Sequence, residues 1–400
     1  MTQRGRLTLV LGVVLYAVAW LLGSRALYPV AVGLVAAPLA AALWVRLAAR
    51  PERVERRTAR EEHLEGDDVR VQLSADLRRG LRPAGLVLSE RVGRLGEQRA
   101  PLDVHGRRAW GRYSLLRVPR GRYRFERASL VLEDPFALAR AEIDVPTVGA
   151  LLVYPRLVEL DTLFSESGRD GHVGRRLLLR RPAGFELHGV RDYQDGESLR
   201  RVHWPSTAKR GRLMVKDLED SPRDELAVVL DARAAAVAGE SFDVQVRAAG
   251  SILLAYARRG RRSLLVVNGA TVETHRVTSL EGDWHAAYGA LAAVEATAAA
   301  PLSALLTGES GPVARAVELV VVTSALPRSV VDALARRSSG GRRTTLVHVD
   351  AATFAAGREG AASADLLRLG ASGVAVTRVR AGDDLARALT GAEEAAMSRA

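Results

Sequence analysis

Two uncharged apolar stretches open the chain, at Leu7–Gly23 and Ala26–Val45, with only Ser24 and Arg25 between them. At 1.5 Å per residue, each stretch would span about 26–30 Å as a helix, close to the thickness of the hydrocarbon core of a bilayer. A cleaved signal peptide would explain the first stretch alone, and a buried core hairpin is the other alternative. Because a second apolar stretch follows at once, the pattern favours a transmembrane helical hairpin over residues 1–48.

We interpret residues 49–63 as a charged linker or as a continuation of the second helix. After them, apolar residues recur at every second position. Val69, Val71 and Leu73 alternate with polar residues, as in a strand with one buried face. Similar short runs, separated by Gly, Pro and Asp turns, follow at 85–89, 112–118, 122–126, 129–133 and 150–154. This spacing is typical of an antiparallel β-sandwich, which we expect over residues 64–158.

Strand-like and helix-like patterns alternate in the last part of the chain. Leu226–Leu230 is a continuous apolar run, as in a strand buried on both faces, and a helical repeat follows from Ser241 to Gly260. Further strands are predicted at 264–267, 319–323, 345–349 and 374–379, and further helices at 284–299, 329–337, 364–369 and from 383. Such alternation predicts a doubly wound α/β domain over residues 224–400, with a connecting segment at 159–223.

The positive charge is concentrated around the apolar stretches. Residues 1–60 carry nine arginines and two glutamates, while the whole chain has a net charge of +12. Arginines that flank both sides of a hairpin place those flanks in the cytoplasm, with Arg25 at a short outer turn. We therefore expect a multi-pass protein of the inner (cytoplasmic) membrane with cytoplasmic soluble domains and the lipid bilayer as a partner. The modest excess elsewhere does not favour nucleic acid as a partner.

The absence of cysteine excludes disulfides, thiolate metal sites and cysteine catalysis. A basic run at 175–182 is interpreted as an exposed strand, or alternatively as a contact for anionic lipid head groups or an acidic partner.

The densest set of charged and aromatic residues lies in the connecting segment. Its members are Glu186, Arg191, Asp192, Tyr193, Asp195, Gly196, Arg200, Arg201, His203, Trp204, Ser206 and Lys209. Three interpretations are open: a network that locks the two domains together, a recognition surface for a partner protein, or catalysis by Glu186, Asp195 or His203. His203 has no nucleophile positioned beside it in the sequence, because Ser206 lies outside any Gly-x-Ser-x-Gly turn.

This segment closely resembles the signature of the domain of unknown function 58 family. The matching elements are Gly184-Phe185-Glu186, Arg191-Asp192-Tyr193, Asp195-Gly196 with Arg200, and Trp204 with Ser206-Thr207-Ala208-Lys209. Arg120–Tyr123 and Asp134–Leu138 also resemble the part of the family that precedes the signature. The resemblance implies a membrane-anchored protein with a von Willebrand factor A-like domain. It further implies a MoxR-type AAA+ ATPase and a transglutaminase-like membrane protein as partners, and no enzymatic activity is established for the family as a whole.

Domains of the von Willebrand factor A type often bind Mg²⁺ through Asp-x-Ser-x-Ser after their first strand. This chain has Asp231-Ala232-Arg233-Ala234-Ala235 there, so the site is degenerate, with a cation in place of a ligand. We expect no metal, and we expect Asp231 to pair with Arg233 or to cap a helix. Since phosphate-binding and dinucleotide-binding motifs are also missing from the sequence, we expect no cofactor.

The sequence thus favours a non-catalytic, membrane-anchored interaction module that faces the cytoplasm and works with a MoxR-type AAA+ ATPase on envelope proteins. One alternative is an uncharacterised enzyme that uses Glu186, Asp195 and His203. The other is a structural organiser at the membrane surface that acts through self-association or lipid contact.

Overall fold

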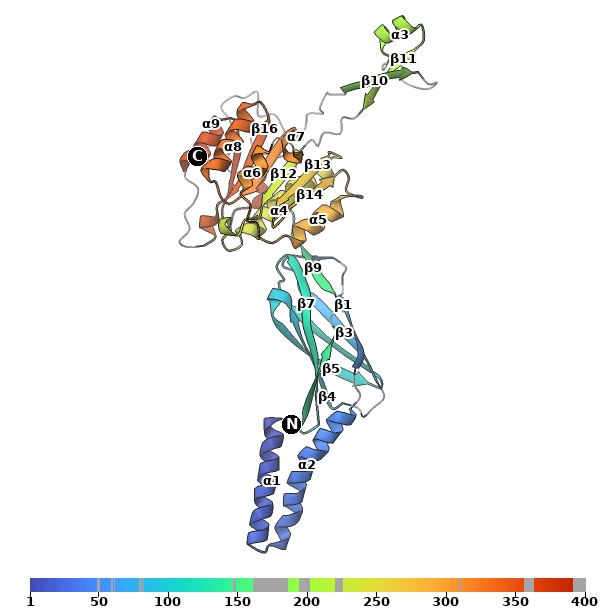
Figure 1. Cartoon of the computed structure of the whole chain (residues 1–400), viewed down its shortest axis with the longest axis vertical. Helices are drawn as coiled ribbons and strands as arrows, with labels where there is room; N and C mark the ends of the chain where they lie inside the picture. The colour runs from blue at the N-terminus through green and yellow to red at the C-terminus, as the bar shows by residue number, and fades with distance from the viewer. Residues whose placement is uncertain are drawn as a thin grey trace. The chain divides into compact units, whose positions relative to one another are not determined.

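A computed structural model describes residues 1–48, 51–58, 60, 62–78, 81, 83–146, 149–160, 186–193, 202–219, 226–308, 311–355 and 363–390. The basic run at 175–182 lies outside the described residues. The contacts within the chain divide it into two units, residues 1–155 and 156–400, each of which is described by itself (Figure 1).

The first unit begins with two antiparallel helices that form a hairpin. They are α1 (Gln3–Leu21) and α2 (Tyr28–Leu47), joined through the short 3₁₀ helix η1 (Arg25–Leu27). Pro29 lies in the first turn of α2, where its missing N–H costs no hydrogen bond. The helices approach closely at Gly12, since a Cβ atom there would lie 2.9 Å from the backbone nitrogen of Val35. Small residues of this kind allow membrane helices to pack tightly.

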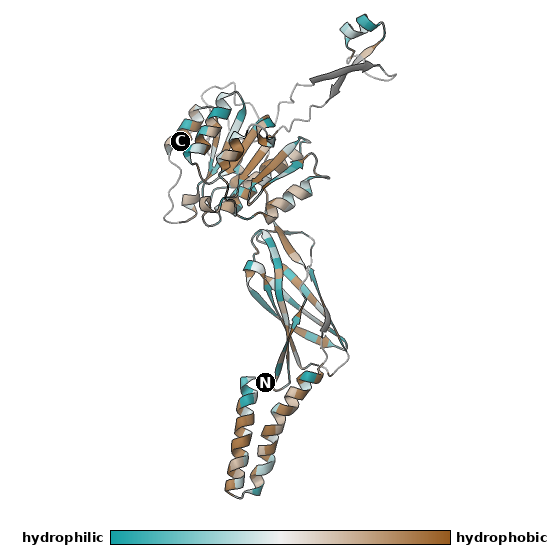
Figure 2. Ribbon diagram, viewed as in Figure 1, coloured by the Kyte–Doolittle hydropathy of each residue, from teal (hydrophilic) through white to brown (hydrophobic). Residues whose placement is uncertain are grey.

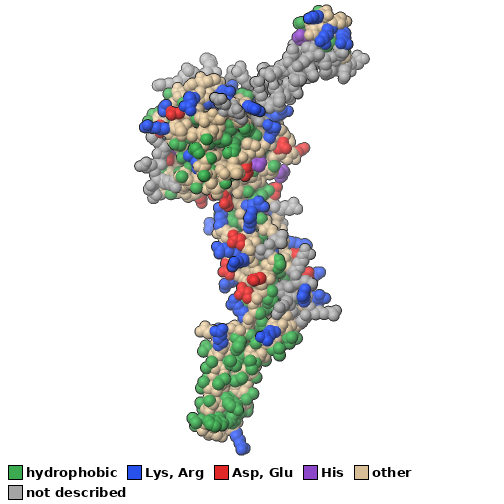
Figure 3. All heavy atoms as spheres, in the orientation of Figure 1, with side chains coloured by type: hydrophobic (Ala, Val, Ile, Leu, Met, Phe, Trp, Pro, Cys, Tyr) green, Lys and Arg blue, Asp and Glu red, His purple; other side chains and the backbone are tan. Residues whose placement is uncertain are grey.

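The outer surface of the hairpin is apolar and exposed. Only 17% of the most apolar window of each helix is buried, which argues against a soluble core hairpin. Figures 2 and 3 show hydrophobic residues along both helices and charged residues near their ends. The two N-terminal helices therefore have the length and surface of a membrane anchor.

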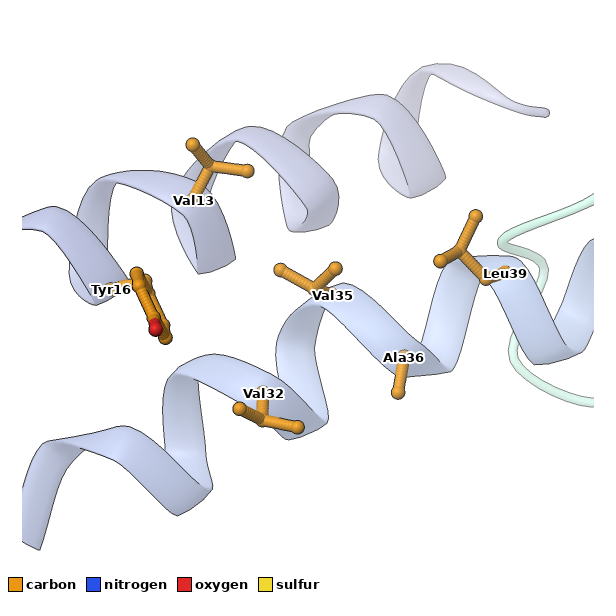
Figure 4. Close-up of a pocket in the computed structure, with 6 residues that line it drawn as sticks. All are labelled: Val13, Tyr16, Val32, Val35, Ala36 and Leu39. Carbon is orange, nitrogen blue, oxygen red and sulfur yellow. The ribbon is translucent and has the colours of Figure 1, made fainter.

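An apolar pocket of about 350 Å³ lies between the two helices. Figure 4 shows the side chains that line it, which are Val13, Tyr16, Val32, Val35, Ala36 and Leu39. No polar group faces this pocket, so it would fill with apolar material in a bilayer.

The rest of the first unit is one curled sheet. Its strands are β1 (Pro51–Thr58), β2 (His63–Leu64), β3 (Val69–Leu77), β4 (Gly85–Val92), β5 (Glu97–His105), β6 (Arg108–Leu115), β7 (Gly121–Glu133), β8 (Arg140–Val145) and β9 (Ala150–Tyr154), with the 3₁₀ helix η2 (Gly93–Leu95). The hydrogen-bonded order is β1-β3-β6-β5-β4-β7-β9-β2, and β8 pairs with β7. Because β2 and β9 are parallel and the other pairs are antiparallel, the sheet is mixed. The predicted strands are present, but the predicted antiparallel sandwich is not confirmed.

The interval 49–63, which we predicted to be a charged linker, contains strand β1. This strand lies at one end of the sheet order and pairs antiparallel with β3, so one of its edges is open. Charged side chains are common on such strands because they discourage pairing with another chain. The two strands predicted at 122–126 and 129–133 are also continuous as β7.

The second unit contains a six-stranded sheet. Its strands are β12 (Leu226–Asp231), β13 (Ser263–Asn268), β14 (Val272–Val277), β15 (Glu318–Thr323), β16 (Arg343–Val349) and β17 (Ala375–Val379). The order is β14-β13-β12-β15-β16-β17, in which only β14 is antiparallel to its neighbour. The alternation of strands and helices predicted for this region is present, whereas the edge strand β14 was missed because its residues are mostly polar and exposed.

Helices cover both faces of this sheet (Figure 1). On one face lie α4 (Ser241–Ala257), α5 (Trp284–Ala293) and α10 (Leu385–Thr390). On the other lie α6 (Leu302–Thr307), α7 (Pro312–Arg315), α8 (Arg328–Ser339) and α9 (Ser363–Ala371). Short 3₁₀ helices are η4 (Ala234–Ala236) and η5 (Ala351–Thr353). The strands of the interior are buried on both faces, which explains their continuous apolar runs.

Candidate functional site

The signature segment contains a two-stranded hairpin and a short helix. Strand β10 (Glu186–Asp192) pairs antiparallel with β11 (Met214–Glu219), and α3 (Trp204–Arg210) precedes β11. The backbone amide of Tyr193 donates to the carbonyl of Leu213 at 3.0 Å, and that of His203 to the carbonyl of Met214 at 2.8 Å. These bonds fix the start of α3 beside the end of the strand pair.

His203 caps the N-terminus of α3. Its Nδ1 accepts a hydrogen bond from the backbone amide of Ser206 at 3.3 Å and lies 2.9 Å from the Ser206 hydroxyl. The sequence alone offered no nucleophile beside His203, whereas one helical turn returns the chain so that the serine faces the ring. This contact has the spacing of an N-terminal cap, which explains it without catalysis.

Trp204 and the cations of this segment are exposed. The Trp204 side chain is 66% exposed, and Lys209, Arg210 and Arg212 are exposed as well. Met214 and Val202 are buried and form the small apolar centre of the segment. Asp195, Gly196, Arg200 and Arg201 lie outside the described residues, and for Glu186, Arg191 and Asp192 only the strand is described.

A row of polar residues crosses the carboxyl edge of the six-stranded sheet. In register across neighbouring strands lie Asn268, Asp231, Thr323, His348 and Arg378. By strand alternation, all of them point to the face covered by α6, α7, α8 and α9. The strand order reverses between β12 and β15, and in open α/β sheets ligands bind at the carboxyl ends beside such a point.

Asp231 is fully buried at the centre of this row, and its carboxylate is held by three side chains. Arg233 forms an ion pair with it at 3.0 Å, which confirms the predicted pairing. The Thr323 hydroxyl donates to Oδ2 at 2.8 Å, and the Asn268 amide donates to Oδ1 at 3.3 Å. Both carboxylate oxygens are therefore engaged by donors from the same chain.

His348 of this row is buried, and a second acidic residue, Asp350, lies two residues after it. Burial alone would raise the pKa of Asp350, but the hydrogen bond and positive charge of Arg378 outweigh it and lower that pKa. Burial also lowers the pKa of His348 to about 4. Neither ring nitrogen of His348 has a hydrogen-bond partner among the described residues. The ring is thus neutral at physiological pH.

A further polar contact lies next to this row. The side-chain amide of the buried Gln245, from α4 on the other face of the sheet, donates to the hydroxyl of Ser324 at 2.7 Å, and Ser324 directly follows Thr323. Within the ranges that the structure describes, no three His, Asp or Glu side chains come together in a way that could hold a metal. The sequence singled out only Asp231 of this row. A polar residue at the end of each buried strand was the signal that would have identified the others.

Comparison with known proteins relates the chain to one family. Residues 189–352, which include most of the signature segment and much of the second unit, match the family described as "Protein of unknown function DUF58". An uncharacterised Bacillus subtilis (strain 168) protein, YeaD, is 27% identical over 238 residues, which cover 59% of this chain and 58% of YeaD.

Among solved structures, Cwp6 from Clostridium difficile aligns over 83% of this chain and 38% of its own, with 8% identity and a TM-score of 0.18. This similarity is too low to indicate a shared fold. The match to the DUF58 family, whose function is unknown, covers residues 189–352 and includes Trp204 and the signature residues around it.

Proposed function

We propose that this protein is a non-catalytic, multi-pass membrane protein whose soluble part faces the cytoplasm and docks a partner protein. The observation that carries the proposal is the exposed Trp204 with three exposed cations, Lys209, Arg210 and Arg212, within nine residues. Trp and Arg are the residue types that most often dominate binding energy at protein interfaces. Burial of this apolar ring by a partner would contribute favourably to binding.

The positive charge around Trp204 indicates which kind of surface the partner would present. Lys209 and Arg210 lie in the last turn of α3, and Arg212 follows it, whereas the described residues 202–213 include no acidic side chain. A complementary surface would combine an apolar pocket for Trp204 with acidic side chains around it. We call Trp204, Lys209, Arg210 and Arg212 the docking face.

The carboxyl edge of the second unit supports a non-catalytic role. A von Willebrand factor A-like domain, as the family resemblance implies, would use this edge to hold a metal. Here Arg233, Thr323 and Asn268 occupy the oxygens of Asp231 instead. The donors around Asp231 therefore form a structural network in which the buried carboxylate is held by its own chain.

The proposed partner is a MoxR-type AAA+ ATPase, with a transglutaminase-like membrane protein as a further candidate. This choice rests on the family resemblance. We infer that the pair acts in the maturation or regulation of envelope proteins, for which the hairpin would tether the protein to the membrane.

Recovery of the partner from membranes tests the docking face. Affinity purification of the full chain should recover the co-expressed ATPase, with an amount that depends on nucleotide. Trp204→Ala, or the charge reversal Lys209→Glu with Arg210→Glu, should reduce recovery at least tenfold. Trp110→Ala is the matched control, because Trp110 is an exposed tryptophan in the other unit. Equal recovery by all variants would contradict the proposal.

Fusion reporters test the proposed orientation. A C-terminal fluorescent protein should be bright, and a C-terminal alkaline phosphatase should be inactive. The opposite pattern would place the soluble part outside the cytoplasm and would exclude a cytoplasmic ATPase as partner.

An enzymatic function is the second candidate, because the Ser206 hydroxyl lies 2.9 Å from His203 Nδ1. A serine activated by this histidine would react with a fluorophosphonate probe. We expect no difference in labelling between the wild-type chain and Ser206→Ala. Labelling that disappears in both Ser206→Ala and His203→Gln would favour the enzyme.

A further inference from the structure

Both ends of the helical hairpin are fastened to the curled sheet. At the start of α1, the Thr2 backbone amide donates to the carbonyl of Leu138 at 3.0 Å. At the end of α2, the amide of Leu81 donates to the carbonyl of Leu47 at 3.0 Å. Side chains near the end of α2 belong to the same buried cluster as the core of the sheet, among them Ala41, Val45 and Ala48. The hairpin and the sheet therefore contact each other at both ends of the hairpin.

The turn between β7 and β8 has a fixed shape. The buried carboxylate of Asp134 accepts the amide of Phe136 at 2.9 Å and the amide of Ala139 at 2.6 Å. Ala137 adopts a left-handed conformation with φ of 55°. This turn leaves the Phe136 side chain 76% exposed, although its backbone is held on both sides. The turn therefore holds an uncovered aromatic ring at the surface in a fixed position, where it is available for a contact outside the protein.

The position of Phe136 relative to the bilayer follows from these contacts. The Thr2 hydroxyl lies 2.7 Å from the carbonyl oxygen of Ala137, next to Phe136 in the chain. The apolar surface of α1 begins at Leu7, about 7.5 Å farther along the helix axis at 1.5 Å per residue. The polar interface of a bilayer is about 5–7 Å thick on each side of the hydrocarbon core. If α1 enters the membrane at Leu7, the turn lies at the level of the head groups.

Leu81, which lies between β3 and β4 in the sequence, is at the other attachment point. This residue is exposed and forms an isolated bridge with Ala48 directly after α2. The sequence around it reads Arg78-Arg79-Gly80-Leu81-Arg82. Arginines next to an apolar residue at a membrane surface favour anionic head groups.

We propose that Phe136 of the β7–β8 turn and Leu81 beside the end of α2 insert into the head-group region of the leaflet from which α1 and α2 enter. The partner of this surface, which we call the lipid-facing rim, is an anionic bilayer. The inference rests on the proposed membrane anchor and extends it, since it makes the curled sheet itself a membrane-contacting element. Its orientation on the bilayer is then set by four points of contact, the two helices, Phe136 and Leu81.

Site-specific labelling tests the rim, because the chain contains no cysteine and a single introduced one is unique. Phe136→Cys carries an environment-sensitive fluorophore in the full chain, reconstituted into vesicles of phosphatidylcholine and phosphatidylglycerol that contain head-group nitroxide lipids. Leu116→Cys is the matched control. Leu116 is 71% exposed and lies in the connection between β6 and β7. The 13 residues of β7, which span about 40 Å, separate this connection from the β7–β8 turn.

We expect severalfold stronger quenching at residue 136 than at residue 116, and quenching at residue 81 that increases with the fraction of anionic lipid. Quenching at residue 136 equal to that at residue 116 would overturn the inference. A thermal midpoint unchanged by Phe136→Cys shows that the variant is folded, as expected for an exposed side chain.

A label in the hairpin separates this inference from the membrane anchor. Val10→Cys lies on the exposed apolar surface of α1 and should be quenched by nitroxides deep in the acyl chains. Quenching at residue 10 without quenching at residue 136 would contradict the lipid-facing rim but agree with the membrane anchor. Absence of quenching at residue 10 would contradict the membrane anchor as well.

Discussion

The guanidinium group of Arg56 lies 2.7 Å from the carboxylate of Glu90, although three strands separate β1 from β4 in the sheet order. The Tyr113 hydroxyl donates to the other oxygen of Glu90 at 2.5 Å. This contact requires the sheet to curl. The edge strand β1 then lies opposite β4, which is in the middle of the strand order. A buried ion pair therefore joins β1 to β4, two strands that are not hydrogen-bonded neighbours in the sheet.

Removal of one member of this pair should destabilise the first unit. Arg56→Met leaves the Glu90 carboxylate buried without its cation, which typically costs about 3–5 kcal/mol. We expect a clear decrease in the thermal midpoint of the full chain in detergent, followed by the fluorescence of its tryptophans. The double variant Arg56→Met with Glu90→Leu should recover most of the loss, because an apolar pair replaces the charges.

The control for this prediction is an exposed pair. Arg99 lies 3.3 Å from Glu97, and both side chains are more than half exposed. Arg99→Met should therefore change the stability by at most about 1 kcal/mol. A similar loss in Arg56→Met and Arg99→Met would show that burial does not matter for these pairs.

Arg56 also shows what the sequence could not predict. The apolar stretches of the hairpin and the buried strands of the second unit have strong periodic patterns, so their elements follow from local residues. Strand β1 has a charged sequence, and the buried side chain of Arg56 is held by Glu90, which lies 34 residues away. A pattern of local polarity cannot report such a contact, which is why β1 was interpreted as a linker.

The candidate site was predictable to a similar degree. The pairing of Asp231 with Arg233 follows from their separation by two residues. Thr323, His348 and Arg378 come from strands that are distant in sequence, and only the parallel register brings them to one row. The exposure of Trp204 depends on packing, which its sequence context does not determine.

Thr323 is predicted to stabilise the second unit through Asp231. Thr323→Val keeps the shape of the side chain but removes the hydroxyl that donates to the buried carboxylate at 2.8 Å. We expect a loss of about 1–3 kcal/mol in the free energy of unfolding. Thr307→Val, at an exposed position of α6, should leave the stability almost unchanged. Equal effects of the two variants would show that the bond to Asp231 is unimportant.

Magnesium is not expected to bind at Asp231. Isothermal titration of the full chain with Mg²⁺ should give no saturable heat, because Arg233 and Thr323 already occupy the carboxylate. The Asp231→Asn variant serves as the blank. Tight, saturable binding that disappears in this variant would contradict the expectation.

The buried His348 should make the second unit sensitive to mild acid. Burial lowers its pKa from 6.5 in the unfolded chain to about 4 in the folded one. Between these values the unfolded chain binds a proton that the folded chain does not. The stability is therefore complete above pH 6.5 and decreases by up to about 3 kcal/mol as the pH falls to 4.

Denaturant titrations at several pH values check this dependence. His348→Leu removes the titrating group and should flatten the profile between pH 6.5 and 4. His105→Gln, at an exposed position of β5, is the control and should retain the wild-type profile. A steep profile in His348→Leu would assign the acid sensitivity to other groups.

Gly5 is predicted to be essential for the attachment of α1 to the sheet. A Cβ atom at this position would lie within 2.1 Å of the Leu138 carbonyl oxygen, so Gly5→Ala must displace the β7–β8 turn. Hydrogen exchange of the Ala139 amide should become faster, because its bond to Asp134 depends on the shape of the turn. Gly33→Ala, with open space around it, should exchange at the wild-type rate. Unchanged exchange in Gly5→Ala would show that the turn adapts.

The short connection between the helices has a consequence for signalling. Between Leu21 and Tyr28 the chain provides a tight turn and one arginine. In the proposed multi-pass orientation, a ligand on the far side of the bilayer would contact almost no part of this short connection. In that orientation, a stimulus from the far side would reach the protein through lipids or through another membrane protein that contacts the hairpin.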